Sequence, residues 1–320
     1  MKLLIENFRK FIKEEESKLD KVSNILSNPG TSLDQYVSVL KRYAKDPTFD
    51  KLASAGATDG DPNDEVVTVK PTSVLVDSLT ATQSEIGFGN SLGDQVINKY
   101  DATRTALGLV MNPIAMSDNK GNPSRLLVYN GEFILDGHHR WSQVMMVNPT
   151  GKVAIDNVTG PALDDEEQAL KAMQFAIAAT ADKVVTKPFK GKDLMSSTYD
   201  EVAQFVMKNV NDDVLKLLVE AGKIQKPSKE LAAKYIAGNL KNIQDKQGQF
   251  SRERSMPQAG DSGVSQDAVN KALGTGKVNF IEPAPSDAQQ KGKELGVAGS
   301  GGTDSGYKKS GVGRRRQKDV

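Results

Sequence analysis

The sequence predicts an α+β protein in which a small mixed sheet with helices occupies residues 65–160. Short apolar stretches bounded by turn residues, which are typical of strands, are confined to that region. Apolar residues at helical spacing precede and follow it, and large apolar residues become scarce near the C-terminus. We therefore expect five parts: N-terminal helices over 1–45, a linker over 46–64, the sheet domain over 65–160, an α-helical subdomain over 161–247 and a disordered tail over 248–320.

Residues 1–27 predict a charged amphipathic helix, which Pro29-Gly30 ends. One interpretation is a bundle or docking helix. The other rests on Leu4-Ile5-Glu6 and Ile12-Lys13-Glu14, which resemble the aliphatic-x-Glu cleavage sites of capsid-targeting peptides on internal head proteins of tailed bacteriophages. That resemblance implies phage head components as partners.

Ser32–Ala44 predicts a second helix with Thr31 or Ser32 as its N-cap. Gly, Asp, Ala and Pro then predict the linker over 46–64. Within the sheet domain the expected elements are, in order, a strand at 66–70, a helical turn at 71–76, a loop at 83–93, a helix at 91–107, and strands at 111–117, 125–129, 132–135 and 153–158. Asn130-Gly131 is a strong hairpin signal between two of these strands.

Residues 161–247 carry four groups of apolar residues at helical spacing, the first of which Asp164-Asp165-Glu166-Glu167 begins. Short connections between them indicate a helical subdomain. We expect it to pack against the sheet domain. The alternative is a DNA-binding addition, although no helix with a basic face stands out.

The stretch from Phe133 to Trp141 contains the main functional signal. Phe133-Ile134-Leu135 predicts a buried strand, Asp136-Gly137 ends it, and a helix follows. Backbone N–H groups and the positive helix end at such a junction favour a phosphate. Gly137 would let the backbone approach a ligand, and His139 and Arg140 add side-chain donors.

The chain has only two histidines, and they are the adjacent His138 and His139. The simplest interpretation is chance, with a solvated histidine and arginine at a helix start. A shared metal ion is disfavoured because neighbouring side chains on a helix diverge by about 100°. The sequence gives no support for a zinc site.

The motif Asp136-Gly137-His138-His139-Arg140-Trp141 resembles the signature of the ParB/sulfiredoxin-like superfamily. In that family a Gly-x-x-Arg turn after a strand opens a helix and binds nucleotide or nucleic-acid phosphates. Leu79–Ile86 is similar to the family's Gln-x-Glu/Arg box, and Asn112–Met116 to its Pro-Ile-x-Val strand. The resemblance covers residues 65–158 and implies a ParB/sulfiredoxin-like small mixed sheet.

The resemblance also implies site residues. Gln83, Gly137, His139 and Arg140 would hold phosphate. Glu85, Asp136 and His138 take the catalytic positions, with Glu85 as a general base or with Glu85 and Asp136 as ligands of a divalent metal. The structural alternatives are an exposed polar loop for Gln83 and Glu85, and a helix cap for Asp136.

The turn motif of this chain differs from those of two branches of the family, which limits the activities that the resemblance implies. His138 stands where sulfiredoxins carry the catalytic cysteine, and the chain has no cysteine, so sulfinic-acid reduction is excluded. The Gly-Glu-Arg-Arg turn of chromosome-partition CTPases is Gly-His-His-Arg here, which disfavours a sliding clamp. The motif is closer to the ParB-like nuclease branch and its free-amino-acid kinases, with ATP or CTP and Mg²⁺ as the implied ligands.

The composition of the chain bears on further classes of protein and of site. The net charge is +1, so the 320-residue chain as a whole indicates neither a nucleic-acid nor a membrane partner. The absence of cysteine also excludes disulfides and thiolate zinc sites. No run of about 18 apolar residues predicts a membrane span, and the N-terminus lacks the apolar core of a secretory signal.

The tail ends in Arg314, Arg315, Arg316 and Lys318. These residues are either a solvated end or a sequence-blind contact to a phosphate backbone. Residues 277–281 form a candidate docking patch.

Together the signals predict a phage ParB-like protein, in the host cytoplasm or the virion, that binds nucleotide or nucleic-acid phosphates. It would act as a metal-dependent nuclease or a phosphoryl-transfer enzyme. The alternative is a non-enzymatic DNA-binding or internal head protein with a degenerate ParB-like fold. The sequence predicts no oligomeric state.

Overall fold

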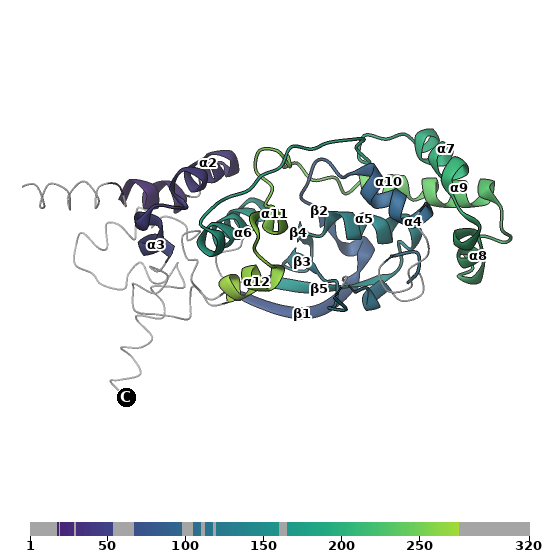
Figure 1. Ribbon diagram of the computed structural model, residues 1–320, viewed down its shortest axis with the longest axis horizontal. Coiled ribbons are helices and arrows are strands. Elements are labelled where there is room, and N and C mark those ends of the chain that lie inside the picture. The colour runs from purple at the N-terminus through teal and green to yellow at the C-terminus, as the bar shows by residue number, and fades with distance from the viewer. Residues whose placement is uncertain are drawn as a thin grey trace, which may run out of the picture. The chain divides into compact units, whose positions relative to one another are not determined.

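The computed structural model describes residues 18, 20–28, 30–53, 67–97, 105–109, 113–117, 120–159 and 165–274 (Figure 1). The chain divides into two compact units. The described residues within 1–69, 159–186 and 257–320 form the first, which we call the helical unit. The described residues within 70–158 and 187–256 form the second, which we call the sheet unit.

The helical unit is organised around α6 (Glu166–Ala181). This helix is contacted by α2 (Leu33–Tyr43), α3 (Pro47–Ala53), α11 (Ala259–Ser262) and α12 (Gln266–Gly274). Every residue of α6 from Ala169 to Ala178 is buried, as expected of a helix surrounded by others. Residues 20–26 are also helical.

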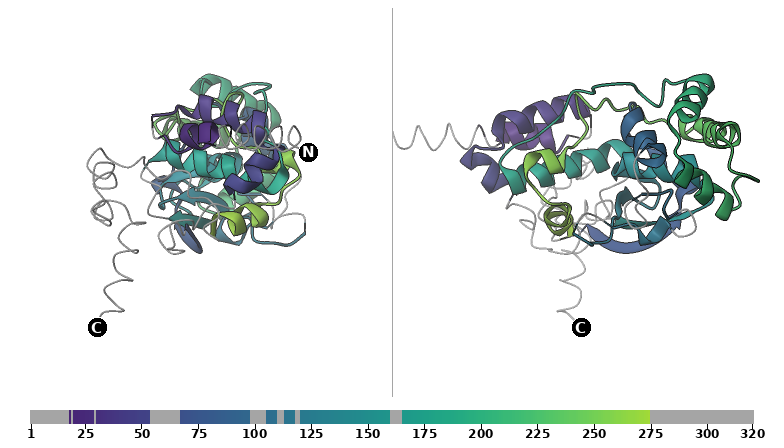
Figure 2. Two further views of the ribbon diagram at one scale, coloured as in Figure 1. Left: turned by 90° about the vertical axis from the view of Figure 1, so that its left-hand side faces the viewer. Right: turned by 45° about the vertical axis from the view of Figure 1, so that its right-hand side comes forward.

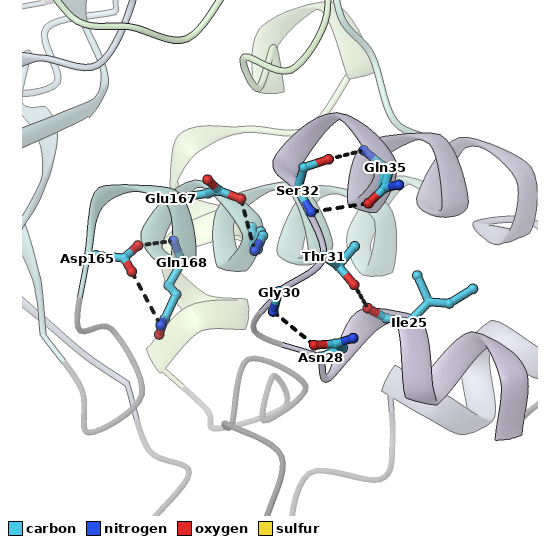
Figure 3. Close-up of polar contacts among 10 residues, drawn as sticks. Ile25, Asn28, Gly30, Thr31, Ser32, Gln35, Asp165, Glu167 and Gln168 are labelled. Atoms are coloured by element: carbon cyan, nitrogen blue, oxygen red, sulfur yellow. Dashed lines mark hydrogen bonds and ion pairs between the residues drawn. The ribbon is translucent and has the colours of Figure 1, made fainter.

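Two helix starts in this unit confirm sequence predictions (Figure 3). Ser32 caps α2 in a reciprocal capping box with Gln35. Asp165 caps α6 by accepting the Gln168 backbone N–H at 2.8 Å.

The predicted linker and tail are wrong where the structure describes them. Residues 47–53 form α3, because Phe49 is buried against Phe175 with ring centroids 4.8 Å apart. Residues 248–274 are ordered rather than disordered, because their few apolar side chains are well spaced: Val269 and Leu273 lie one helical turn apart in α12 and are both buried. Residues 54–66 and 275–320 lie outside the described residues.

A five-stranded sheet with the order β1-β5-β3-β4-β2 confirms the α+β class. The strands are β1 (Thr68–Leu75), β2 (Thr80–Ala81), β3 (Leu126–Tyr129), β4 (Phe133–Asp136) and β5 (Lys152–Thr159). β3 and β4 pair antiparallel, whereas β2 with β4 and β3 with β5 are parallel, so the sheet is mixed. The predicted hairpin is confirmed: Asn130 and Gly131 have φ of 51° and 74°, as a type I′ turn requires.

Three predicted elements of the sheet unit differ. The helical turn expected at 71–76 is strand up to Leu75, since β1 lies at a sheet edge where Pro71 is tolerated, and only Val76–Ser78 forms a 3₁₀ turn (η1). The strand expected at 111–117 is a 3₁₀ turn at Pro113–Ala115 (η3). The helix expected at 91–107 is reduced to a π-turn at Gly89–Gly93 (η2) and a short α4 (Asp94–Val96), and residues 98–104 lie outside the described part.

The sheet unit also contains α5 (His138–Val147), α7 (Tyr199–Asn209), α8 (Asp212–Glu220), α9 (Lys229–Gly238) and α10 (Leu240–Gln244), which Figure 1 labels; Figure 2 gives two further views of the same ribbon. α9 holds the C-terminal end of α5, because the Tyr235 hydroxyl donates to the Val147 carbonyl at 2.7 Å. The helical subdomain expected at 161–247 is therefore divided: α6 belongs to the helical unit and α7–α10 to the sheet unit.

Among the described residues, none of the helices combines the length and apolar character needed to cross a bilayer.

Candidate functional site

The histidine pair lies at a strand-to-helix junction, as predicted. β4 ends at Asp136, Gly137 has φ of 100°, and α5 begins at His138. β2 runs parallel to β4 with Ala81 opposite Ile134, so the segment that follows β2 runs beside this junction. The Gln-x-Glu box and the histidine pair therefore meet in space.

Only glycine fits at position 137. A Cβ there would lie 2.6 Å from Cδ2 of the buried Leu126 side chain, and the backbone is left-handed. The Gly137 N–H donates to its neighbour Asp136 at Oδ1, 2.8 Å away. Asp136 therefore stabilises the turn, but no side chain among the described residues caps α5.

The start of α5 leaves three successive backbone N–H groups, those of His138, His139 and Arg140, without an intrahelical acceptor. The first bond of the helix is made by Trp141, whose N–H donates to the Gly137 carbonyl at 3.0 Å. Together with the helix dipole, these amides give the junction a positive electrostatic character.

His138 ties the two motifs together. Its buried Nε2 accepts the backbone N–H groups of Thr82 at 3.2 Å and Gln83 at 3.3 Å. Burial, helped by the charges of His139 and Arg252, lowers the pKa of His138 to about 3. The ring is therefore neutral and Nε2 is an acceptor, which assigns the proton to Nδ1.

A catalytic role of His138 stays a prediction. In this structure its Nε2 accepts two backbone N–H groups, which gives the ring a structural role. His138 holds the Gln-x-Glu box in register with the junction.

His139 is half-buried and accepts the Gly87 N–H at Nε2, 3.2 Å away. Burial and the charge of Arg252 lower its pKa to about 4, so the ring is neutral near pH 7. The donor that remains on a neutral ring with an accepting Nε2 is Nδ1–H.

Arg140 is held by the start of β3. Its Nη1 donates to the Ser124 hydroxyl at 2.6 Å and to the Arg125 carbonyl at 2.9 Å. Both bonds use the same nitrogen, so the guanidinium is fixed while its other edge keeps its donors. The positive charge of Arg140 also acts to lower the pKa of Asp136.

The pKa of the Asp136 carboxyl is raised above its ordinary value, because desolvation by the surrounding protein raises it most. The charge of Arg140, the bond from the Gly137 N–H and the charge of Arg252 lower it in part. A half-buried carboxyl with a perturbed pKa is typical of proton-transfer sites as well as of structural ones.

Gln83 and Glu85 do not form an exposed polar loop, which was the structural alternative for them. Gln83 is buried, and both polar groups of its backbone are hydrogen-bonded. Its N–H donates to His138 Nε2, and its carbonyl accepts the Gly248 N–H at 3.1 Å. Glu85 is half-buried and its Oε2 accepts the Ser84 hydroxyl at 2.8 Å and the Arg252 N–H at 3.1 Å.

The predicted metal pair of Glu85 and Asp136 does not form a protein-made cage. Within the described ranges, no group of three or more His, Cys, Asp or Glu side chains could hold an ion. One oxygen of each carboxylate already accepts a bond from the protein's own N–H. A Mg²⁺ site normally needs several oxygens in octahedral geometry, which these two carboxylates alone do not supply.

Several predicted features fall outside the described residues. These are the peptides Leu4-Ile5-Glu6 and Ile12-Lys13-Glu14, the patch at 277–281, and the basic end with Arg314, Arg315, Arg316 and Lys318.

The sequence missed two residues of the site. Arg252 lies in the region predicted to be disordered, and no local motif marks it. Asp193 fixes the loop after Glu85, since its Oδ1 accepts the N–H groups of Ile86 at 2.9 Å and Met195 at 3.0 Å. An isolated aspartate in a polar connection gives no signal of such a role.

Comparison with models of protein families, with curated proteins and with solved structures found no match to this chain. The resemblance to the ParB/sulfiredoxin-like superfamily therefore rests on its motifs and stays a prediction.

Proposed function

We propose that the β4–α5 junction binds a phosphate group of a nucleotide or a nucleic acid. The observation that carries the proposal is the uncapped start of α5 behind the left-handed Gly137, with the Arg140 guanidinium fixed beside it.

Physical chemistry favours an anion at this place. Three aligned N–H groups and the helix dipole stabilise negative charge, and phosphate is the common ligand of such helix starts. An arginine that is already held on one edge loses little entropy when it forms paired bonds with phosphate oxygens. The neutral ring of His139 adds a donor that does not change charge near pH 7.

The finer assignments belong to the same proposal. The motifs support a ParB/sulfiredoxin-like domain of the ParB-like nuclease branch in a tailed-bacteriophage protein, present in the host cytoplasm or the virion. Candidate ligands are ATP or CTP, with Mg²⁺ carried on the nucleotide phosphates, and DNA.

A second candidate function is catalytic, and the raised pKa of the half-buried Asp136 carboxyl favours it. With a raised pKa it would accept a proton from an attacking water or hydroxyl during phosphodiester hydrolysis or phosphoryl transfer. Glu85 is the second candidate base. A non-enzymatic DNA-binding or internal head protein would bind the same phosphate without turnover.

The binding proposal is tested with the full chain and three probes: ATP with Mg²⁺, CTP with Mg²⁺, and a thymidine oligonucleotide. Affinities are measured by calorimetry for wild type, Arg140→Ala and Arg42→Ala. Arg42→Ala is the matched control because it removes the same charge from an exposed position on α2. The Arg42 guanidinium lies over the Tyr43 ring there.

We expect Arg140→Ala to weaken binding about tenfold or more, as loss of a charged hydrogen bond of 1.5–3 kcal/mol implies. Arg42→Ala should bind as wild type does. Equal affinity of wild type and Arg140→Ala for every probe would refute the proposal. Turnover that Asp136→Asn abolishes while binding persists would establish the catalytic candidate.

A further inference from the structure

We infer that Arg252 is a second phosphate-binding residue, which the segment 246–252 brings to the β4–α5 junction. We call this segment the strap. The inference rests on the proposed function but names a residue outside the region that carries the family resemblance.

The strap is bonded along the segment that follows β2. Phe250 pairs in parallel with Gln83, as an isolated bridge. The backbone bonds run in both directions: Ala81 N–H to Lys246 O at 3.0 Å, Gly248 N–H to Gln83 O at 3.1 Å, Phe250 N–H to Thr82 O at 3.1 Å and Ser84 N–H to Phe250 O at 3.0 Å. The strap therefore continues the sheet edge beyond β2.

Gly248 fixes how closely the two segments approach. A Cβ at this position would lie 2.1 Å from the Thr82 carbonyl carbon and 2.5 Å from the Ala81 oxygen. Both are backbone atoms that cannot move aside independently. The strap thus lies against the same residues, Thr82 and Gln83, whose N–H groups His138 binds.

The end of the strap is anchored at the Gln-x-Glu box. The Arg252 backbone N–H donates to Glu85 Oε2 at 3.1 Å, so the main chain of Arg252 is held beside Glu85. This bond uses the main chain of Arg252, so the half-buried Arg252 side chain begins at a fixed position.

The charge of Arg252 reaches the junction. It acts to lower the pKa of Asp136, of His138 and of His139, which lie on the last residue of β4 and the first two of α5. Arg140 acts on Asp136 from its own position on α5. Two arginines from distant parts of the chain thus act on the same carboxyl group, and the strap places the main chain of one of them beside Glu85.

This arrangement suits a phosphate ligand. With both histidines neutral, Glu85 and Asp136 offset the charges of Arg140 and Arg252, so the site has no large excess charge before a ligand arrives. A phosphate group at the α5 amides would then accept hydrogen bonds from the guanidinium groups of both Arg140 and Arg252. Each guanidinium can donate a pair of bonds to phosphate oxygens.

The test uses the full chain with ATP–Mg²⁺ and the thymidine oligonucleotide as probes. Arg252→Ala is compared with Arg254→Ala, an exposed arginine two positions away that removes the same charge. We expect Arg252→Ala to weaken binding about tenfold, as loss of one charged contact implies, and Arg254→Ala to stay within about twofold. Arg252→Lys should retain part of the affinity because it keeps the charge but not the paired geometry.

A second readout separates ligand binding from folding. Because the chain has two histidines, NMR titration of the imidazole signals follows each ring separately. Arg252→Gln keeps most of the side-chain volume and removes the charge, so it should raise the pKa of His139 above about 4 and lose affinity, while Arg254→Gln should change neither.

The outcomes distinguish the two proposals. If Arg140→Ala weakens binding but Arg252→Ala and Arg252→Gln bind as wild type does, the inference on Arg252 is wrong and the phosphate site remains. If Arg140→Ala has no effect, the proposed function itself fails.

Discussion

Replacement of Gly137 by alanine tests the junction that positions the site. At φ of 100° an alanine is strained by about 1–2 kcal/mol. Its Cβ would also lie 2.6 Å from Leu126 Cδ2, and Leu126 is only 2% exposed, so its side chain has little room to move. Such overpacking costs about 1–3 kcal/mol, which gives a total loss of about 2–5 kcal/mol in the free energy of unfolding.

The control for Gly137→Ala is Gly131→Ala. Gly131 has φ of 74°, but a Cβ there meets nothing within 4 Å, so only the strain of about 1–2 kcal/mol applies. The difference between the two variants isolates the overlap with Leu126. In a double-mutant cycle, Leu126→Ala should cancel that part of the loss.

The assay is urea denaturation followed by the fluorescence of Trp141. This is the single tryptophan of the chain, and it is fully buried in α5, four residues after Gly137. Its signal therefore reports the sheet unit. Equal losses of stability in Gly137→Ala and Gly131→Ala would contradict the close approach of Leu126 to position 137.

Three further predictions concern stability. Lowering the pH from 6.5 to about 5 should destabilise the sheet unit, because the unfolded chain binds a proton at His138 and at His139, whereas the folded rings, with pKa values of about 3 and about 4, do not. Each histidine contributes up to about 1.4 kcal/mol per pH unit, so His138→Gln should remove about half of the change in the urea midpoint over this range. Gly248→Ala should cost about 3 kcal/mol or more, because its Cβ overlaps the Thr82 backbone, whereas Gly238→Ala, with nothing within 4 Å at the end of α9, should be neutral or slightly stabilising in thermal melts. Asp165→Ala should cost the helical unit about 1 kcal/mol through loss of the α6 cap, and an unchanged melting temperature would contradict that role.

Local chemistry determined what the sequence could predict. The hairpin at Asn130-Gly131 and the helix starts predicted at Thr31 or Ser32 and at Asp164–Glu167 depend on residues that are neighbours in the chain. They form as expected, with Ser32 and Asp165 as the caps. The junction at Gly137 follows the same rule, since a left-handed glycine directly after an apolar strand requires no distant partner.

Elements that depend on tertiary context were predicted less well. Pro71 indicates a break in isolation, but at the sheet edge its missing N–H costs nothing, and the strand continues to Leu75. Residues 248–274 were expected to be disordered, because no composition rule shows that Val269 and Leu273 find a partner helix in α6.

The candidate site divides in the same way. Asp136, His139 and Arg140 could be found from one motif, and the structure places them together. Arg252 could not, because it joins the site through a bond to Glu85, 167 residues earlier in the chain. The position of His138 was evident but its environment was not, since burial and two backbone donors decide its protonation.

The most direct test of the central claim uses protein labelled with ¹⁵N at histidine alone. Such a sample gives two backbone amide signals, from the first two residues of α5. Titration with ATP–Mg²⁺, CTP–Mg²⁺ and a thymidine oligonucleotide should shift both signals downfield with at least one probe, and Arg140→Ala should reduce the shift. A probe that binds the chain while both amide signals stay in place would show that phosphate is held elsewhere and would contradict the account.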